Sequence, residues 1–526
     1  MMSVAARGPC DEAIPLATEP TPCSRATARW VLAATILGSS MAFIDGTVVN
    51  VALPVLQKSL NASVSSVQWV VEAYSLFLSA LVLVSGSLGD RFGRRRVFAI
   101  GVALFAVSSV GCALAPGVAW LVAARTVQGI GAALLVPSSL AILGASFAAR
   151  ERGRAVGTWS SLTSIAAAIG PIAGGWLVQV ASWRAVFFLN VPIAGAVVAI
   201  ALKKVPETRN PSAKRLDLPG AIAATVGLAA LVYGLIEAPA AGWSDPRVWV
   251  SLAVGVIGLA AFVVIEERST HPMVPLDLFR IRAFAGANLL TFFLYAALSA
   301  VFFLLPFELI QSQGYSPAQA GAALLPLIVL IFSLSRVAGM ILDRMGPRLP
   351  LTVGPAIAAV GFFLLGVPHA DARFATALLP ALSTLGLGMA ITVAPLTTTV
   401  LNAVREHEAG IASGINNAVA RVAGLLAIAA FGVVASYGFD RALDRRLSES
   451  GLGSIAAKIS PAERHKLGAA KAPPDLSELQ RRRAQQAIAA ALADSFRASM
   501  KIAAALAVLS SMCALVFLPP HRTAGP

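Results

Sequence analysis

Charged residues, histidine and cysteine are scarce in this chain of 526 residues. Asp, Glu, Lys and Arg together make up only 13% of it, and it holds five histidines and four cysteines. The histidines are dispersed, the cysteines lack metal-ligand spacing, and no HExxH, CxxC, phosphate-binding loop or nucleophile elbow occurs. We therefore expect no metal site, no disulfide framework, no enzyme activity and no direct use of ATP.

Apolar residues dominate the composition. They make up 57% of the chain, and the mean hydropathy is +0.77, which is more apolar surface than one soluble core could bury. The net charge of +15 does not indicate nucleic-acid binding, because Lys and Arg fall in short clusters between apolar runs, where they act as topology signals. The sequence predicts an integral membrane protein whose main solvent is the lipid bilayer.

Fourteen apolar runs are long enough to cross a bilayer as helices, which takes about 20 residues each. Barrel strands would be much shorter, so the predicted fold class is all-α. The predicted spans lie near 30–56, 67–88, 97–115, 119–147, 155–179, 185–202, 217–238, 247–265, 284–310, 319–342, 350–368, 374–398, 409–437 and 495–518.

The loop charges predict the orientation. With a cytoplasmic N-terminus, the cytoplasmic segments hold 22 Lys and Arg, whereas the short outer loops hold four, Lys58, Arg184, Arg247 and Arg373. Positive residues concentrate on the cytoplasmic side of membrane proteins. The polar first 29 residues lack a signal-peptide pattern and are expected to form a cytoplasmic tail. We expect both termini in the cytoplasm and a multi-pass protein of the bacterial inner (plasma) membrane.

The segment 438–493, between the last two predicted spans, is unusually polar. It carries ten Lys and Arg and six Asp and Glu in an Ala-rich run, and the odd number of preceding spans, thirteen, places it outside. Long loops escape the positive-inside rule, so its basic character does not contradict that side. Two alternatives stay open: a small external helical cap, or a solvated and partly disordered insertion.

Two motifs of the first half recur in the second. The run GSLGDRFGRRR at 86–96 returns 253 positions later as GMILDRMGPRL, and five residues between Gly129 and Gly157 return at an offset of 257. Parallel repeats of this kind place a substrate cavity at their interface, and rocking of the halves gives alternating access. The predicted division is an N-terminal tail at 1–29, a six-helix half at 30–203, a linker with two inserted helices at 204–283, a second six-helix half at 284–518 and a cytoplasmic tail at 519–526.

These motifs carry a family resemblance. The runs at 86–96, LVAARTVQGIG at 121–131 and GPIAGG at 170–175 resemble, in the same order, the signature motifs of the major facilitator superfamily. IDGTVVNVALP at 44–54, WRAVFFLNVP at 183–192 and the fourteen spans resemble its drug:proton antiporter branch of multidrug efflux transporters. The resemblance implies a major facilitator fold with two extra central helices, driven by a proton gradient rather than by a bound cofactor.

The run at 86–96 has the features of a gating latch. Its glycines allow close approach and turning, and its aspartate can pair with the following arginines or cap a neighbouring helix. A loop that is basic only for topology would need neither the acid, nor the glycines, nor a second copy. The resemblance implies a role in conformational switching. The candidate residues are Gly86, Asp90, Arg91, Gly93, Arg94 and Arg95, with Asp343 and Arg344 in the second copy.

Arg125 lies deep in the fourth predicted span, where an isolated guanidinium is costly and should pair with a carboxylate. The family's packing implies Asp45, in the first span, as the partner. Such a pair can act as a proton switch, because a neighbouring cation favours the ionised carboxylate. A static ion pair that only fixes packing is the alternative.

Further polar residues in the spans are candidates for proton coupling or substrate contact. Glu72 is a second candidate for proton coupling and, with Glu308, for attracting cationic ligands, and each could instead be a solvated residue at the membrane interface. Asn416 and Asn417 precede Arg421 on a span that could face the cavity. We take these three as candidates for pairing or substrate contact.

Gly170, Pro171, Gly174 and Gly175 remove side chains and one backbone donor from the fifth span. We expect a kink here and tight contact with the opposing half. In the family this pattern marks antiporters, so the resemblance implies export.

The leading hypothesis is a proton-coupled antiporter that exports small amphipathic, cationic drugs or toxic compounds. A dedicated exporter of one metabolite, such as an antibiotic, a siderophore or an amino acid derivative, would use the same motifs. A membrane sensor or enzyme lacks a supporting motif, and a channel would not need two latch-bearing halves. The expected partners are a small-molecule substrate, protons and the bilayer, with docking of a periplasmic adaptor left open and no nucleic acid.

Overall fold

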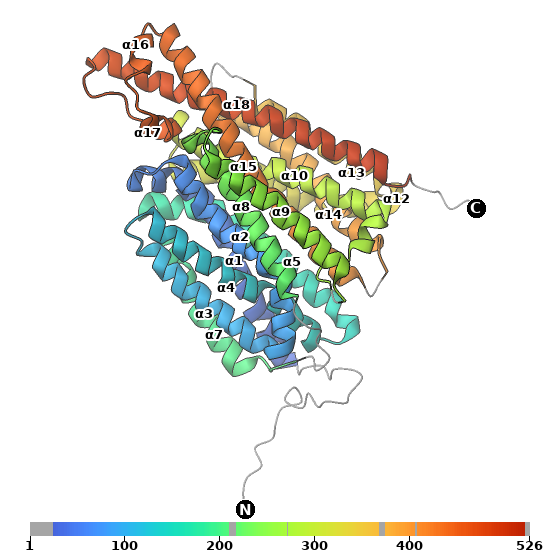
Figure 1. Ribbon diagram of the computed structural model, residues 1–526. Helices are drawn as coiled ribbons and strands as arrows, with labels where there is room; N and C mark the ends of the chain where they lie inside the picture. The colour runs from blue at the N-terminus through green and yellow to red at the C-terminus, as the bar shows by residue number, and fades with distance from the viewer. Residues whose placement is uncertain (1–24, 210–216, 271, 368–373, 406–407, 521–526) are drawn as a thin grey trace, which may run out of the picture. The chain divides into compact units, whose positions relative to one another are not determined.

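The computed structural model describes residues 25–209, 217–270, 272–367, 374–405 and 408–520. Within these ranges the chain is helical and has no strand. Fourteen of its helical stretches are long and apolar enough to span a membrane, so the predicted all-α fold and its span count are confirmed for the described part (Figure 1). Most of the predicted N-terminal tail, 1–29, and of the C-terminal tail, 519–526, lies outside the described residues.

The first nine helices cover the first eight spans. The sixth span is divided into α6 and α7 at Leu189, because Pro192 lacks the N–H that would bind the carbonyl of Phe188. The bounds are α1 Arg25–Leu60, α2 Val64–Phe92, α3 Arg94–Ala113, α4 Val118–Ser146, α5 Ala149–Val180, α6 Ala185–Phe188, α7 Asn190–Lys204, α8 Leu218–Ala241 and α9 Pro246–Arg268.

The remaining helices form the other six spans and the polar segment between the last two. The bounds are α10 Arg282–Phe307, α11 Pro317–Ala322, α12 Leu325–Met345, α13 Arg348–Leu365, α14 Leu379–Asn402, α15 Ala409–Glu449, α16 Gly453–Ala456, α17 Pro461–Arg464 and α18 Glu478–Phe517. Single helical turns, 3-10 or π, lie at Leu276–Arg280, Glu308–Ser312, Phe374–Leu378 and Leu467–Ala469.

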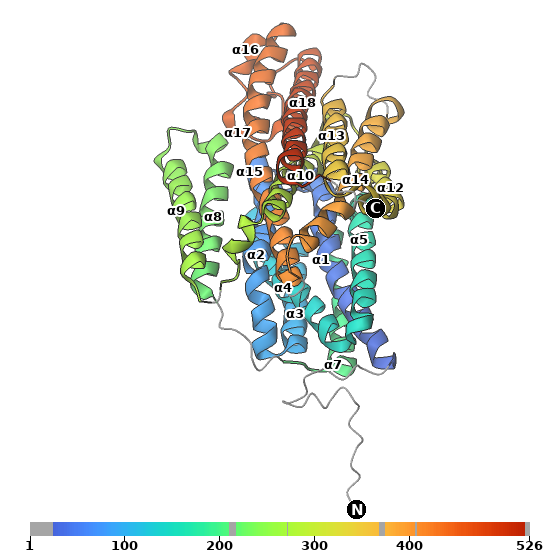
Figure 2. The same ribbon diagram turned by 90° about the vertical axis from the view of Figure 1, so that its right-hand side faces the viewer.

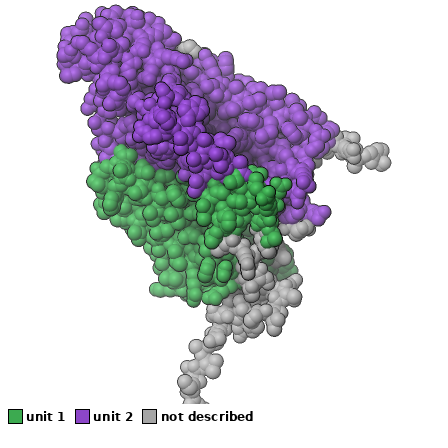
Figure 3. All heavy atoms as spheres, viewed as in Figure 1, with its two compact units in different colours: residues 1–49, 73–225, 261–273 green, residues 50–72, 226–260, 274–526 purple. Residues whose placement is uncertain are grey.

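The described chain divides into two compact units (Figure 3). Unit 1 comprises Met1–Val49, Ala73–Thr225 and Ala261–Met273, and unit 2 comprises Asn50–Glu72, Val226–Ala260 and Val274–Pro526. The segment Asn50–Glu72, which contains the turn between α1 and α2, thus packs with the C-terminal part of the chain. The predicted domain boundaries, which were drawn from the repeat, stay a prediction.

In unit 1, α3 and α4 pack at close range because glycines face each other. A Cβ atom on Gly131 would lie 2.8 Å from the backbone nitrogen of Phe105 and 3.0 Å from the carbonyl oxygen of Gly101. In the same unit, a Cβ on Gly129 would lie 3.1 Å from the Cα of Tyr74. The surrounding core is apolar and includes Phe98.

Unit 2 repeats this packing at the equivalent positions. Gly388, 257 positions after Gly131, approaches the carbonyl of Gly354 and the backbone nitrogen of Ala358. These partners stand 253 positions after Gly101 and Phe105, so α13 and α14 contact each other as α3 and α4 do. Likewise, Gly386 approaches Leu327, the counterpart of Tyr74. The internal repeat therefore extends from the sequence to the helix contacts.

The inserted helices α8 and α9 lie side by side (Figure 2). Within unit 2, a Cβ on Gly227 would lie 2.8 Å from the backbone nitrogen of Leu259, and one on Gly234 would lie 2.9 Å from the side chain of Leu252. Small residues allow this close pairing of membrane helices.

The polar segment 438–493 is helical over much of its length. The helices that contain the last two predicted spans extend beyond them, because α15 continues to Glu449 and α18 begins at Glu478. Ion pairs hold these extensions: Arg446 Nε donates to Asp494 Oδ2 at 2.9 Å, and Arg464 Nη2 donates to Asp444 Oδ1 at 2.7 Å. Of the two alternatives left open for this segment, the structure has the helical one.

The connection between α15 and α18 is anchored on the turn between α1 and α2, within unit 2. The backbone N–H of Val64 donates to the carbonyl of His465 at 2.9 Å, and Gln57 Nε2 donates to the carbonyl of Lys466 at 3.0 Å. The connection and the turn therefore form one packed element.

Candidate functional site

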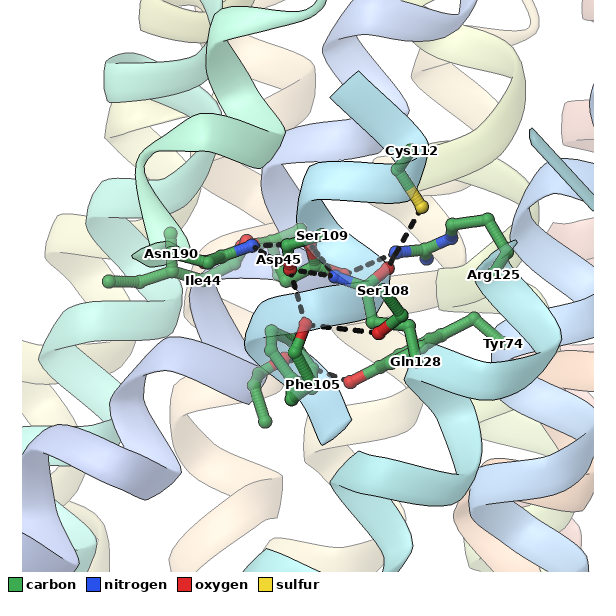
Figure 4. Close-up of polar contacts among 12 residues, drawn as sticks. Ile44, Asp45, Tyr74, Phe105, Ser108, Ser109, Cys112, Arg125, Gln128 and Asn190 are labelled. Atoms are coloured by element: carbon green, nitrogen blue, oxygen red, sulfur yellow. Dashed lines mark hydrogen bonds and ion pairs between the residues drawn. The ribbon is translucent and has the colours of Figure 1, made fainter. Parts of the chain in front are cut away.

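Asp45, on α1, lies at the centre of a buried polar network in unit 1 (Figure 4). Its side chain is 0% exposed and forms an ion pair with Arg125 of α4, whose side chain is 1% exposed. The structure therefore brings together the two residues that sequence reasoning paired.

Gln128 extends this ion pair. It stands three residues after Arg125, so the two side chains lie on the same face of α4. Arg125 Nη1 donates to Gln128 Oε1 at 2.7 Å, while Gln128 Nε2 donates to Asp45 Oδ1 at 3.0 Å and to Ser109 Oγ at 2.8 Å. One amide thus contacts the cation, the carboxylate and a hydroxyl on α3.

Asn190 completes the donor set around Asp45. It is the first residue of α7, directly after the break at Leu189, and its Nδ2 donates to Asp45 Oδ1 at 3.0 Å and to Ser109 Oγ at 3.3 Å. Ser109 in turn donates to the carbonyl of Phe105 at 2.7 Å. Four helices, α1, α3, α4 and α7, therefore contribute side chains to one polar network.

Aromatic rings cover the cation. The guanidinium carbon of Arg125 lies 4.3 Å from the ring centroid of Tyr74 and 5.8 Å from that of Phe187. Cation–π contacts of this kind stabilise a guanidinium that has lost water. Three N–H donors point at Asp45, from Arg125, Gln128 and Asn190, and this set matches an ionised carboxylate.

Sequence reasoning missed Gln128, Asn190 and Ser109. The first two stand inside runs that were noted, LVAARTVQGIG and WRAVFFLNVP, but an uncharged amide in an apolar helix does not by itself demand a partner. Gln128 stands three residues after Arg125, and Asn190 stands two residues before Pro192. These positions are the signals that could have identified the two amides.

Glu72 and Glu308 are both buried within the structure, so neither side chain is solvated, as a residue at the membrane–water interface would be. The Glu72 side chain is 0% exposed, and neither of its carboxylate oxygens has a hydrogen-bond partner among the described residues. Glu308 is 5% exposed and accepts a hydrogen bond from Gln313 Nε2 at 3.1 Å. Both belong to unit 2, whereas Asp45 belongs to unit 1.

The candidates on α15 have separate surroundings. Asn416 Nδ2 donates to Thr291 Oγ1 of α10 at 2.7 Å. Asn417 is exposed and donates to the carbonyl of Ser413 in its own helix at 3.0 Å. Arg421 is half-buried. Asn416 thus joins two helices of unit 2, whereas the hydrogen bond of the exposed Asn417 stays within α15.

The latch run, residues 86–96, contains a turn that is capped by acidic side chains. Gly93, with φ +109°, precedes α3, and Asp90 accepts from Arg94 Nε at 2.8 Å. Glu207, which sequence reasoning missed, accepts the backbone N–H of Arg95 at 3.0 Å and thereby caps α3.

The other latch residues are less engaged. Arg91 and Arg344 are exposed, and the side chain of Asp343 lies outside the described residues. The expectation that Gly86 allows a close approach was wrong, since a Cβ there would meet no described atom within 4 Å. Gly346, at φ +70°, ends α12 at the position equivalent to Gly93.

The comparisons with known proteins agree with this architecture. Residues 35–428 match the Major Facilitator Superfamily. The chain belongs to the major facilitator superfamily. A solved structure, that of a bacterial homolog to the human lysosomal transporter Spinster, has a TM-score of 0.64 at 18% identity over 94% of this chain and 98% of its own, and it supports the fold alone.

Curated relatives of this major facilitator are named for resistance and export. The multidrug resistance protein Stp of Mycobacterium tuberculosis (strain CDC 1551 / Oshkosh) is 36% identical over 83% of this chain and 80% of its own length. The tetracenomycin C resistance and export protein of Streptomyces glaucescens is 36% identical over 79% and 77%. The predicted family and fold class are therefore confirmed.

The glycine motif of this major facilitator makes its close contact inside one unit. A Cβ on Gly170 would lie 3.2 Å from the carbonyl oxygen of Ile44, and one on Gly174 would lie 3.0 Å from that of Val48. The close partner of these two glycines is therefore α1 of the same unit, and their expected contact with the opposing half stays a prediction. Pro171 lies inside α5, and Gly175 is buried.

Proposed function

We propose that this protein is a proton-coupled antiporter that exports small amphipathic, cationic drugs or toxic compounds across the bacterial plasma membrane. Alternating access of its two homologous halves carries out the transport. The energy source is the proton gradient, with no bound cofactor. The observation that carries the proposal is the buried carboxylate of Asp45 with its complete set of donors.

The network supports proton coupling through its charge balance. In the described arrangement the charges of Asp45 and Arg125 cancel in a site with almost no exposure. A proton that binds Asp45 leaves Arg125 as an uncompensated buried cation, which is costly unless water or a displaced helix compensates it. Binding of a proton therefore favours a different helix arrangement, as an antiporter requires.

Export and substrate class find support in the relatives and in the buried acids. Relatives named for multidrug resistance and for antibiotic export suit a transporter that removes compounds from the cell. Glu72 is a second acid that can carry a proton, because a neutral carboxyl is far cheaper to bury without partners than an ionised one. Ionised Glu72 or Glu308 would attract a cationic substrate.

The loop charges support the orientation of the chain. The latch run and the other short basic loops belong on the cytoplasmic side by the positive-inside rule, which places both termini in the cytoplasm. The segment 438–493 then lies outside.

A reconstituted system tests the proposal. Purified protein in liposomes with an imposed pH gradient would be given a panel of fluorescent lipophilic cations, and proton release on substrate addition would be recorded. We expect release by the wild type and none by Asp45→Asn or Arg125→Ala. Asp277→Asn, in an ion pair with Arg280 whose side chains are both 85% exposed, is the matched control and should behave as the wild type.

A dedicated exporter of one metabolite is the second candidate, favoured by relatives that are named for single compounds, such as tetracenomycin C. Transport of none of the cations, together with proton release on addition of one antibiotic, would support it over the multidrug function. Transport that does not depend on pH would refute proton coupling.

A further inference from the structure

The proline of α5 leaves one carbonyl without its usual donor. Pro171 has no N–H, so it cannot bind the carbonyl of Ala167, which lies four residues earlier in the helix. A backbone carbonyl in a membrane span is costly to leave unpaired. In unit 1, the hydroxyl of Thr47 on α1 donates to this carbonyl at 3.0 Å.

Gly170 makes room for this hydroxyl. The position that a Cβ on Gly170 would take is occupied by Thr47 Oγ1, and one helical turn later the backbone of Val48 lies against Gly174. Any larger side chain at position 170 would displace Thr47 from the carbonyl of Ala167. The glycines and the proline thus produce one docking point for α1.

The Thr47 hydroxyl has alternatives to this bond. Its oxygen also lies 3.0 Å from the carbonyl of Ile44 and 3.2 Å from that of Phe43, both in its own helix. A hydroxyl carries a single hydrogen, so it serves α5 or its own helix at any moment. Thr47 can therefore exchange an interhelical bond for an intrahelical one without losing a partner.

Asp45 stands two residues before Thr47, which places the two side chains about 200° apart around α1. One face of α1 thus holds the carboxylate in its network, and the nearly opposite face holds the bond to α5. A movement of α1 that follows a change at Asp45 must also stretch or release the bond between Thr47 and Ala167.

We propose that Thr47 is a positioning residue that couples the protonation of Asp45 to α5, at the carbonyl of Ala167 that Pro171 leaves without its helical donor. This inference rests on the proposed antiport and adds the element to which the proton event is passed. Thr47 does not contact the proton-binding group, and it acts through the position of α1.

The test compares Thr47→Val, which keeps the shape and removes the donor, with Thr47→Ser, which keeps the donor. Substrate-driven proton release in liposomes would be measured across a pH series. Loss of one hydrogen bond should lower the turnover of Thr47→Val by roughly threefold to tenfold and displace its pH profile. Thr47→Ser should stay within about twofold of the wild type, by the same reasoning.

A double-mutant cycle identifies the acceptor. Pro171→Ala restores an N–H for the carbonyl of Ala167, so adding Thr47→Val to it should change thermal stability far less than Thr47→Val does alone. The stability cycle needs no transport activity, so it remains informative if Pro171→Ala is inactive.

The outcomes separate the two proposals. Absence of proton release from the wild type with every substrate would overturn the antiport, and the role of Thr47 with it. Release by the wild type with the same pH profile in Thr47→Val would overturn the role of Thr47 alone. An equal loss of stability from Thr47→Val in both backgrounds would also overturn it.

Discussion

Replacing Asp45 with asparagine should strongly destabilise the protein, although it only exchanges one carboxylate oxygen for an NH₂ group. The amide has nearly the same shape, but it removes the counter-charge of Arg125, whose side chain is 1% exposed. It also introduces an NH₂ group among three donors, from Arg125, Gln128 and Asn190. Removing one partner of a buried ion pair costs about 3–5 kcal/mol, and we expect the free energy of unfolding to fall by that amount.

Denaturant unfolding of the purified protein in detergent measures this change. The decisive comparison is the double variant Asp45→Asn/Arg125→Met, which also removes the stranded cation. The cost of a broken buried pair comes mainly from the charge left unpaired, so the double variant should regain most of the lost stability. Asp277→Asn, in its exposed ion pair, should leave unfolding unchanged.

Two results would refute the reasoning. If Asp45→Asn unfolds like the wild type, the site is hydrated and the ion pair does not carry the charge balance described above. If the double variant is less stable than Asp45→Asn alone, Arg125 stabilises the fold through contacts other than its pairing with Asp45.

Three further changes have predicted outcomes. Gly131→Ala should lower stability by about 1–3 kcal/mol in thermal unfolding, because its Cβ would press on α3, whereas Gly144→Ala, with open space in the described structure, should be neutral or mildly stabilising. Glu207→Gln should weaken the cap of α3 by about 1 kcal/mol, seen as faster proteolysis after Gly93. Burial opposes the ionisation of Glu463, but hydrogen bonds, including one from the Lys471 amide at 2.9 Å, outweigh it and lower its pKa. The stability that this carboxylate adds is therefore present above its ordinary pKa of 4.5 and lost as the pH falls through the lower folded value. Hydrogen exchange at the Lys471 amide should rise over that range relative to a Glu463→Gln control, and a flat profile would contradict the assignment.

The spans and the central ion pair could be predicted because a strong physical constraint requires each of them. Bilayer thickness fixes the length of an apolar run, so fourteen runs predicted fourteen helices. A guanidinium in the fourth span demands a carboxylate, and Asp45 supplied it. The repeat was visible because Gly131 and Gly388 serve the same close helix contact.

The partners of amides and glycines and the lengths of the last helices are subject to weaker constraints, so the sequence does not determine them. Amides such as Gln128 and Asn190 carry no charge, so the sequence does not reveal which polar group they meet. A glycine face predicts that a helix approaches closely but does not identify that helix, so the contact of Gly170 with α1 was not predicted. The helices beyond 437 continue through charged residues because partners such as Asp494 neutralise them, and such pairing depends on tertiary contacts.

The thiol of Cys112 makes the central network observable by chemical labelling. Its sulfur lies 3.6 Å from Gln128 Oε1 and is buried beside the groups that hold Asp45. A reagent can reach it only when water can, so the rate of alkylation measures how often the network opens. In a variant whose other three cysteines are serine, that rate would report hydration of the site under each pH gradient and with each substrate, without an attached probe.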